Sequence, residues 1–168
     1  MNDGWVRVAI GLGSNLDSPK LQIQRACATL QSLANTRWIG VSELVFSKPQ
    51  GPQDQPDFVN AVCVLETLLT PIELLHTLQQ IEQSQGRIKK RHWGERLIDL
   101  DILLYGEQQL VEPELVIPHP QIAQRDFVIL PLAQIWPDAM IPGQGKVTDV
   151  LKRLTQHFVL TQSQEGKA

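Results

Sequence analysis

The segment from Trp93 to Gly106, WGERLIDLDILLYG, most constrains the fold, because two aspartates interrupt an otherwise apolar run. Successive side chains of an extended strand point to opposite faces, so Asp99 and Asp101 would lie on the same face. The rest of the run would follow the same alternation, with Leu103 and Tyr105 beside the aspartates and Ile98, Leu100, Ile102 and Leu104 on the opposite face. The pattern predicts a core strand that carries a carboxylate pair.

Two carboxylates at this spacing lie about 6.5 to 7 Å apart along a strand. Such a pair suits one or two hard divalent cations, and Mg2+ is the usual choice where phosphates supply the remaining ligands. Arg96 stands three residues before Asp99, where a guanidinium can hold a phosphate beside the metal. A strand with one polar, exposed face is the simpler interpretation, and the aspartate pair alone leaves it open.

The length of 168 residues fits a single domain over 1–168, and a frayed tail is expected at about 159–168. The 42% hydrophobic and 20% charged content is ordinary for a soluble protein, and no apolar run is long enough for a membrane span. The N-terminus lacks the pattern of a signal peptide, so we expect a cytoplasmic location and no membrane partner. No coiled-coil pattern is present, and a monomer is expected. Cys27 and Cys63 are expected to be reduced core residues.

The net charge of −3 argues against a general nucleic-acid binder, which needs a broad excess of Lys and Arg. Positive charge is instead concentrated between Arg87 and Arg96, where five basic residues accompany His92 and Trp93. This cluster predicts a focused anion site. Trp93, inside such a loop, suits a stacking or lid role.

The order of predicted elements indicates an α+β fold. Strands are predicted at Val6–Leu12, Thr36–Ser47, Asp57–Glu66 and around Asp99–Tyr105, and helices at Pro19–Ala34 and Thr70–Gln85, the second with a Thr70–Glu73 capping box. This is the order of a ferredoxin-like βαββαβ sandwich, with an antiparallel sheet and its helices on one face. Additional C-terminal helices are expected at Asp126–Ile135 and Val147–Phe158. Gly11 to Asn15 is expected to form a tight turn after the first strand.

Several other side chains have the chemistry of a ligand site. Gln79 and Glu82 lie three apart on the edge of the second predicted helix, and an exposed helix edge is the simpler alternative. Phe58 and Asn60 would share a strand face and suit a flat heterocycle, with one ring to stack and one amide to donate and accept. His119, Arg125 and Phe127 follow a proline-rich segment and can reach the same cleft.

Taken together, these motifs resemble the 6-hydroxymethyl-7,8-dihydropterin pyrophosphokinase family of the folate pathway. The resemblance rests on segments spread over nearly the whole chain: Gly11–Asn15, Gly51–Ala61, Glu82 with Gly86 and Arg87, Trp93–Arg96 with Asp99–Asp101, and Pro118–His119 with Arg125 and Phe127. It implies transfer of the terminal diphosphate of ATP to a pterin alcohol, with release of AMP.

The resemblance also implies the site residues. Asp99 and Asp101 would hold two Mg2+ ions, and with Arg87 and Arg96 they form the implied catalytic set. The positions implied around ATP, the co-substrate, are Gln79, Glu82, Arg87, Lys89, Trp93, Arg96, Ile102, His119 and Arg125. The positions implied around the pterin are Ser47, Gln50, Phe58, Asn60, Trp93 and Phe127.

Two other function classes remain open at this point. A two-metal phosphodiesterase or nucleotidyltransferase would also use a carboxylate pair with a basic loop. An RNA-binding sheet could share this strand order, but the acidic chain lacks the glycine- and aromatic-rich strand of such modules. The heterocycle-binding residues favour the small-molecule enzyme.

Overall fold

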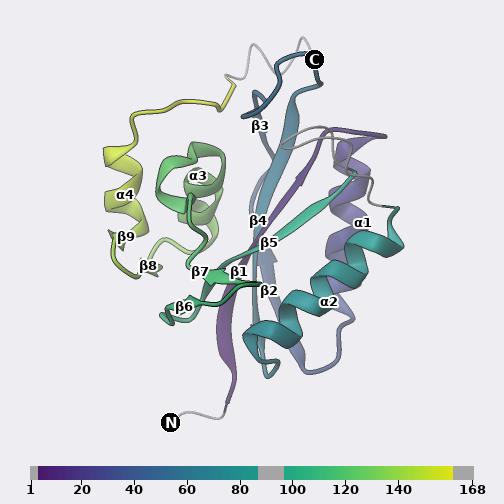
Figure 1. Ribbon diagram of the computed structural model, residues 1–168, viewed down its shortest axis with the longest axis vertical. Helices are drawn as coiled ribbons and strands as arrows, with labels where there is room; N and C mark the ends of the chain where they lie inside the picture. The colour runs from purple at the N-terminus through teal and green to yellow at the C-terminus, as the bar shows by residue number, and fades with distance from the viewer. Residues whose placement is uncertain (1–3, 87–96, 161–168) are drawn as a thin grey trace.

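The computed structural model describes residues 4–86 and 97–160 (Figure 1). The first half contains β1 (Val6–Ser14), α1 (Pro19–Gln31), β2 (Thr36–Val41), β3 (Val45–Ser47), β4 (Phe58–Thr67) and α2 (Pro71–Ser84). The second half contains β5 (Asp99–Tyr105), β6 (Leu110–Val111), β7 (Val116–Ile117), the 3-10 helix η1 (Ile122–Gln124), α3 (Asp126–Ile135), β8 (Met140–Ile141), β9 (Gly145–Lys146) and α4 (Val147–Arg153). Arg87, Lys89, Trp93 and Arg96 lie outside the described residues.

The main sheet is antiparallel, with strand order β2-β4-β1-β5, and β3 pairs with β4 beyond the end of β2. This is the topology of a ferredoxin-like sandwich, so the predicted fold class is confirmed. Figure 1 shows α1 and α2 on one face of the sheet, and α3 and α4 on the other. The sheet therefore lies between two helical layers, and the additional C-terminal helices form the second layer.

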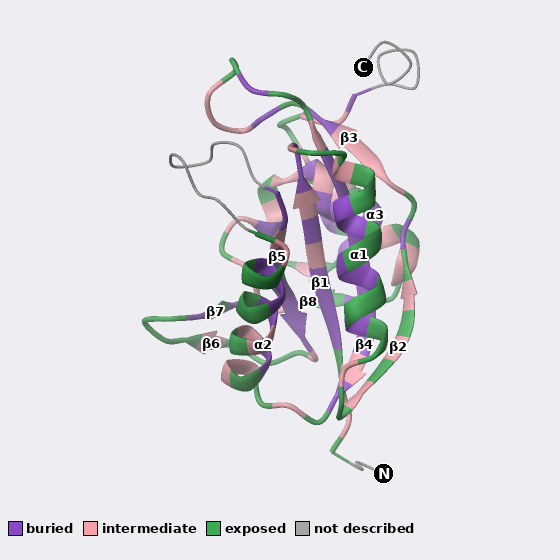
Figure 2. Cartoon of the chain, turned by 90° about the vertical axis from the view of Figure 1, so that its right-hand side faces the viewer, coloured by how far each residue is buried: buried purple, intermediate pink, exposed green. Residues whose placement is uncertain are grey.

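Each face of the sheet has its own apolar core. The face under α1 and α2 buries alternate residues of the central strands, such as Ile10, Leu65 and Ile102, against Leu30 and Leu78. The opposite face, under α3, buries Ala9, Val62, Leu103, Leu104 and Leu132. Figure 2 shows the central strands as largely buried and the outer sides of α1 and α2 as exposed. Among the described residues, no helix has the length and apolarity that a membrane crossing requires.

The alternation predicted for β5 holds as far as Leu103, which lines the pocket with the aspartates, and is wrong for Leu104 and Tyr105. The β1–β5 register shifts between Ala9 and Ile10, so that Leu103 is an extra residue in β5. Such a β-bulge reverses the alternation beyond it. Tyr105 consequently lies in the core under α1 and α2, and Leu104 lies in the core under α3.

The predicted strand Thr36–Ser47 is interrupted. Both β2 and β3 pair with β4, as expected of antiparallel neighbours, but residues between them leave the regular ladder. The hydroxyl of Ser42 accepts a 3.0 Å hydrogen bond from the amide of Val62, in place of a backbone carbonyl. A side-chain acceptor of this kind replaces one bond of the ladder and allows the strand to change direction.

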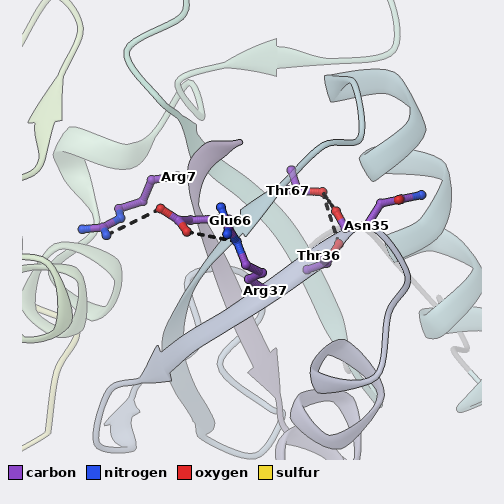
Figure 3. Close-up of polar contacts among 6 residues, drawn as sticks. All are labelled: Arg7, Asn35, Thr36, Arg37, Glu66 and Thr67. Atoms are coloured by element: carbon purple, nitrogen blue, oxygen red, sulfur yellow. Dashed lines mark hydrogen bonds and ion pairs between the residues drawn. The ribbon is translucent and has the colours of Figure 1, made fainter. Parts of the chain in front are cut away.

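Helix α1 ends at Gln31, earlier than the predicted Ala34. Asn35 adopts a left-handed conformation with φ of 58°, which turns the chain into β2. The hydroxyl of Thr67 donates a 3.1 Å hydrogen bond to the carbonyl of Asn35 and lies 3.2 Å from the hydroxyl of Thr36 (Figure 3). These contacts fix the turn, which a helical periodicity in the sequence does not reveal.

The same end of the sheet carries a cross-strand ion-pair cluster. Glu66 of β4 lies 3.8 Å from Arg7 of β1 and 3.5 Å from Arg37 of β2, as Figure 3 shows. Surface pairs of this kind contribute about 0 to 1 kcal/mol each, so the cluster favours the strand register more than it stabilises the fold.

Helix α4 ends at Arg153, and the prediction that it continues to Phe158 is wrong. The chain instead runs back to β3, where Val159 forms a β-bridge with Ser47. Val159 and Leu160, the first residues of the predicted tail, thus lie beside β3, and residues 161–168 lie outside the described part of the chain. The capped helix α2, in contrast, has both capping-box hydrogen bonds and ends at Ser84, one residue from its predicted end.

Candidate active site

A pocket of about 110 Å3 opens where the sheet face under α3 meets the start of that helix. Its lining comes from β1, β3, β4, β5 and α3, from the chain that follows β3, and from the residue that precedes α3. The lining residues are Gly11, Leu12, Gly13, Ser47, Lys48, Gln50, Phe58, Asn60, Ala61, Asp99, Asp101, Leu103, Arg125, Phe127 and Val128. Eight of the predicted site residues are in this list: Ser47, Gln50, Phe58, Asn60, Asp99, Asp101, Arg125 and Phe127.

The two aspartates lie at the start of β5, on the face that the sequence predicts. Asp99 is half-buried and Asp101 is exposed, whereas Leu100 between them is buried on the opposite face. In the β1–β5 ladder, Asp99 lies opposite Gly13 and Asp101 lies opposite Gly11. The carboxylates therefore lie beside backbone of β1 that carries no side chains at these two positions.

These glycines remain inside β1, although the sequence predicts a tight turn at this point. A Cβ at Gly13 would approach the Oδ1 of Asn60 to 3.3 Å, and one at Gly11 would approach Leu103 to 3.3 Å. Glycine within a strand often marks a place where a ligand approaches the backbone. Here the missing side chains leave the pocket floor open.

Arg125 precedes α3 and, with Lys48, is one of two cationic residues in the lining of the described pocket. Its Nη2 donates to the side-chain oxygen of Gln121, while its Nε is buried without a hydrogen-bond partner in the described structure. Burial lowers the pKa of the guanidinium, and the carboxylates of Asp101 and Asp99 oppose that shift. An arginine remains charged under these conditions, so a buried donor is available for an anion in the pocket.

His119 lies near Arg125 but outside the pocket lining. Its backbone amide donates to the carbonyl of Leu103, and its Nδ1 accepts a 3.1 Å hydrogen bond from the amide of Gln121. Burial lowers the pKa of His119 to about 4, with a further contribution from the charge of Arg125. At neutral pH the ring is therefore neutral, and because Nδ1 is the acceptor, the proton is assigned to Nε2.

Other lining residues carry recognition groups for a flat, polar ligand. Phe58 and Phe127 line the pocket from β4 and α3. The Nδ2 of Asn60 donates to the hydroxyl of Ser47 at 2.7 Å and to the carbonyl of Val45 at 3.3 Å. These bonds fix the amide of Asn60, whose Oδ1 faces Gly13.

Besides His119, three predicted ATP residues lie away from the pocket lining. Gln79 is exposed on α2. Ile102 is buried in the core under α1 and α2. Glu82, expected on a helix edge, is buried, and its carboxylate accepts a 2.7 Å hydrogen bond from the amide of Leu100. The roles of these residues toward ATP stay predictions.

Sequence reasoning missed part of the pocket: Gly11, Leu12, Gly13, Lys48, Ala61, Leu103 and Val128. The two glycines had a detectable signal, since glycine at alternate positions of an otherwise apolar strand is unusual. The apolar residues had none, because they are ordinary core residue types.

The family model described as 7,8-dihydro-6-hydroxymethylpterin-pyrophosphokinase matches residues 9–137. The chain belongs to this family. Similar pyrophosphokinases, named 2-amino-4-hydroxy-6-hydroxymethyldihydropteridine pyrophosphokinase, include one from Haemophilus influenzae, 47% identical over 151 residues that cover 90% of this chain and 94% of that protein. Another, from Pseudomonas aeruginosa, is 48% identical over 145 residues, covering 86% of this chain and 90% of that protein. The predictions of a pterin pyrophosphokinase family and of an ATP-dependent pyrophosphokinase in folate biosynthesis are therefore confirmed.

Solved structures support the fold of this pyrophosphokinase. The crystal structure of wild-type Plasmodium falciparum HPPK-DHPS with pteroate superposes with a TM-score of 0.70 and covers 89% of this chain at 13% identity. The match spans 42% of the Plasmodium chain, less than half of its length. At this identity the likeness establishes the shared fold.

Proposed function

We propose that this pyrophosphokinase transfers diphosphate from ATP to the hydroxymethyl oxygen of 6-hydroxymethyl-7,8-dihydropterin and releases AMP. The observation that carries the proposal is the convergence of two carboxylates, a buried guanidinium and two phenyl rings in one pocket. The carboxylates and the guanidinium suit a phosphate group, and the rings suit a heterocycle. Family membership supports the same pair of substrates.

The pocket suits Mg2+ bound jointly by protein and phosphate. No group of three His, Cys, Asp or Glu side chains able to hold a metal occurs in residues 4–86 and 97–160. Asp99 and Asp101 would thus be the protein ligands, and ATP and water would complete the coordination, as is usual for Mg2+. Two ions on this pair are part of the proposal. When bound, Mg2+ would neutralise phosphate charge during transfer.

The pterin would lie between Phe58 and Phe127, with its hydrogen-bonding edge toward Asn60 and Ser47. Because Nδ2 of Asn60 is already used, its Oδ1 is the atom that can accept from a ring N–H. The hydroxyl of Ser47 accepts from Asn60 and can still donate its own proton to the ligand. Gln50 would complete this wall. Such a site can form hydrogen bonds with both the donors and the acceptors on the edge of a flat ring.

The chemistry then depends mainly on alignment and charge. The pterin hydroxyl would attack the β-phosphorus of ATP in line. The bond between the β-phosphorus and the oxygen that bridges it to the α-phosphate would break, and AMP would leave with that oxygen. Arg125 would hold the transferring group through its buried Nε–H, and His119 would donate from Nε2 to a phosphate. Arg87, Lys89, Trp93 and Arg96, implied by the family resemblance, lie outside the described residues.

We further propose that the chain acts as one catalytic domain and as a cytoplasmic monomer, with no nucleic-acid or membrane partner. A two-metal phosphodiesterase or nucleotidyltransferase would also need the carboxylate pair, but the paired rings and the oriented Asn60 are unnecessary for those reactions. The family assignment does not favour that alternative.

The test is to incubate the protein with MgATP and 6-hydroxymethyl-7,8-dihydropterin and to separate the products. Equal amounts of AMP and pterin diphosphate, dependent on both Mg2+ and the pterin, are expected. Asp99→Asn and Asp101→Asn should each reduce turnover by on the order of a thousandfold. Asp138→Asn removes an exposed carboxylate elsewhere and should leave turnover unchanged. Formation of ADP, or near-normal rates in both site variants, would contradict the proposal.

A further inference from the structure

The segment His157 to Leu160, here called the C-terminal strap, lies along the free edge of β3. The amide of Lys48 donates to the carbonyl of Phe158 at 2.8 Å, and the amide of Leu160 donates to the carbonyl of Phe46 at 2.8 Å. Val159 bridges Ser47 between these two bonds. β3 is thus held between β4 on one side and the strap on the other.

Asp126, in the first turn of α3, attaches the strap to that helix. Its side chain accepts hydrogen bonds from the amide of Phe158, at 3.1 Å to Oδ1 and 2.9 Å to Oδ2, and from the amide of Val159, at 3.0 Å to Oδ2. Asp126 is 6% exposed, so these bonds are largely shielded from water. A carboxylate in the first turn of a helix is also favoured by the helix dipole.

Through these contacts the strap packs against two parts of the proposed pterin pocket, the β3 side and the ring of Phe127. The strap covers the outer edge of β3, whose Ser47 and neighbouring Lys48 line the pocket. The ring of Phe158 packs edge-on against Phe127, with centroids 5.8 Å apart and planes at 85°. Asp126 thus anchors a strap that supports the polar wall through β3 and the stacking ring of Phe127 through Phe158.

We propose that Asp126 is a positioning residue for pterin recognition, which acts by holding the strap against β3 and Phe127. Its own side chain is not part of the pocket lining, and it is hydrogen-bonded to the strap, so its effect passes through Phe158 and the β3 backbone. The inference rests on the proposed function, because it assigns the pocket walls to the pterin. Without the carboxylate, the strap amides lose a buried, charged acceptor. The β3 side of the pocket and the ring of Phe127 then both become more mobile.

The experiment compares Asp126→Asn and Asp126→Ala with Asp138→Asn, an exposed control in the same C-terminal region. Asn retains one acceptor oxygen, so the effects should increase from Asn to Ala. In the Ala variant we expect KM for the pterin to rise about tenfold, the equivalent of one lost charge-assisted hydrogen bond. KM for ATP and kcat should stay within about twofold. Hydrogen exchange at the amides of Phe158 and Val159 should accelerate, with the β1 amides unchanged.

Each result supports or overturns the inference. Fast exchange in the strap with an unchanged pterin KM would overturn it, because the bonds between Asp126 and the strap would then have a structural role alone. Equal losses for pterin and ATP would also overturn it. If the Ala variant fails to fold, a chain ending at His157 removes both donor amides and should show the same selective rise. Absence of pyrophosphokinase activity in the unmodified chain would instead refute the proposed function, while fluorescence titration with 6-hydroxymethylpterin would still measure pocket affinity.

Discussion

The amide of Leu100 donates a 2.7 Å hydrogen bond to the carboxylate of Glu82 across the interface between β5 and α2. Leu100 separates the two aspartates, so the bond fixes the backbone from which both carboxylates project. Glu82 is 6% exposed, which makes this a buried, charge-assisted hydrogen bond. Although Glu82 lies on the opposite face of β5, it can control the geometry of the pocket.

Glu82→Ala is therefore expected to reduce both stability and turnover. The amide of Leu100 would be left without this acceptor, at a cost of about 1 to 3 kcal/mol. Displacement of the aspartates should lower kcat by about tenfold to a hundredfold. Urea unfolding and steady-state kinetics measure the two effects, and Gln80→Ala, at an exposed position of α2, provides the control.

Glu82→Gln separates this positioning role from direct binding of ATP. Glutamine retains an acceptor oxygen for Leu100, so kcat should stay within a few fold of the unmodified chain. A large rise in KM for ATP with unchanged kcat would instead favour the direct contact predicted from the sequence.

The relationship between Glu82 and Leu100 shows what the sequence could and could not predict. Local signals were sufficient for α2, because Thr70, Pro71 and Glu73 specify a helix start by contacts within one turn. Local signals were also sufficient for Asp99 and Asp101, because the alternation of side chains along a strand places both carboxylates on the same face of the sheet. The burial of Glu82 depends on a strand 18 residues away along the chain, and no local pattern contains that information.

The remaining errors have the same origin in tertiary contacts. The bulge at Leu103 exists only in relation to β1, and it transfers Tyr105 to the other core. The extended path of Phe158 and Val159 depends on Asp126 and β3, which replace the helix that periodicity predicts. Sequence patterns thus predicted the sheet, and together with the family resemblance they named eight residues that line the pocket, whereas contacts between distant segments determine the supporting structure.

Gly13→Ala should selectively weaken pterin binding. The added methyl group would lie 3.3 Å from the Oδ1 of Asn60, and a few tenths of an ångström of movement would disturb the atom that we assign to the pterin edge. Overpacking at this site should raise KM for the pterin about tenfold, with a smaller effect on ATP. Steady-state kinetics with each substrate varied in turn measures the difference.

Gly40→Ala is the matched control for this substitution. Its methyl group would make an equally close contact of 3.3 Å, but with Ile135 and away from the pocket. Equal changes in KM in the two variants would show that the effect comes from general strain in the sheet.

Cys27 and Cys63 should be unreactive in the folded protein, as expected of core thiols. Both are free and buried. Burial raises the pKa of Cys27 to about 11 and raises that of Cys63 as well. Because the thiolate is the reactive form, Ellman's reagent at pH 8 should modify them slowly in the native state and rapidly in denaturant. Rapid native reaction would indicate that α1 separates readily from the sheet.

The neutral state of His119 should make stability depend on pH in a specific window. Burial and the charge of Arg125 lower the pKa of His119 to about 4, below its usual value of about 6.5. Above pH 6.5 the ring is neutral in both the folded and the unfolded chain, and its contribution to stability is fully present. As the pH falls toward 4, the unfolded chain binds a proton that the folded chain excludes, so stability decreases.

His119→Asn tests this linkage, because an asparagine oxygen can replace Nδ1 as the acceptor for the Gln121 amide without titrating. Urea unfolding at pH 7 and pH 4.5 gives the loss of stability on acidification for each protein. Carboxylates contribute to the loss in both, so their effect cancels in the comparison, and the variant should lose less. An equal loss would mean that the folded chain binds the proton on His119 as readily as the unfolded chain does, so that burial and Arg125 do not lower the pKa of this residue.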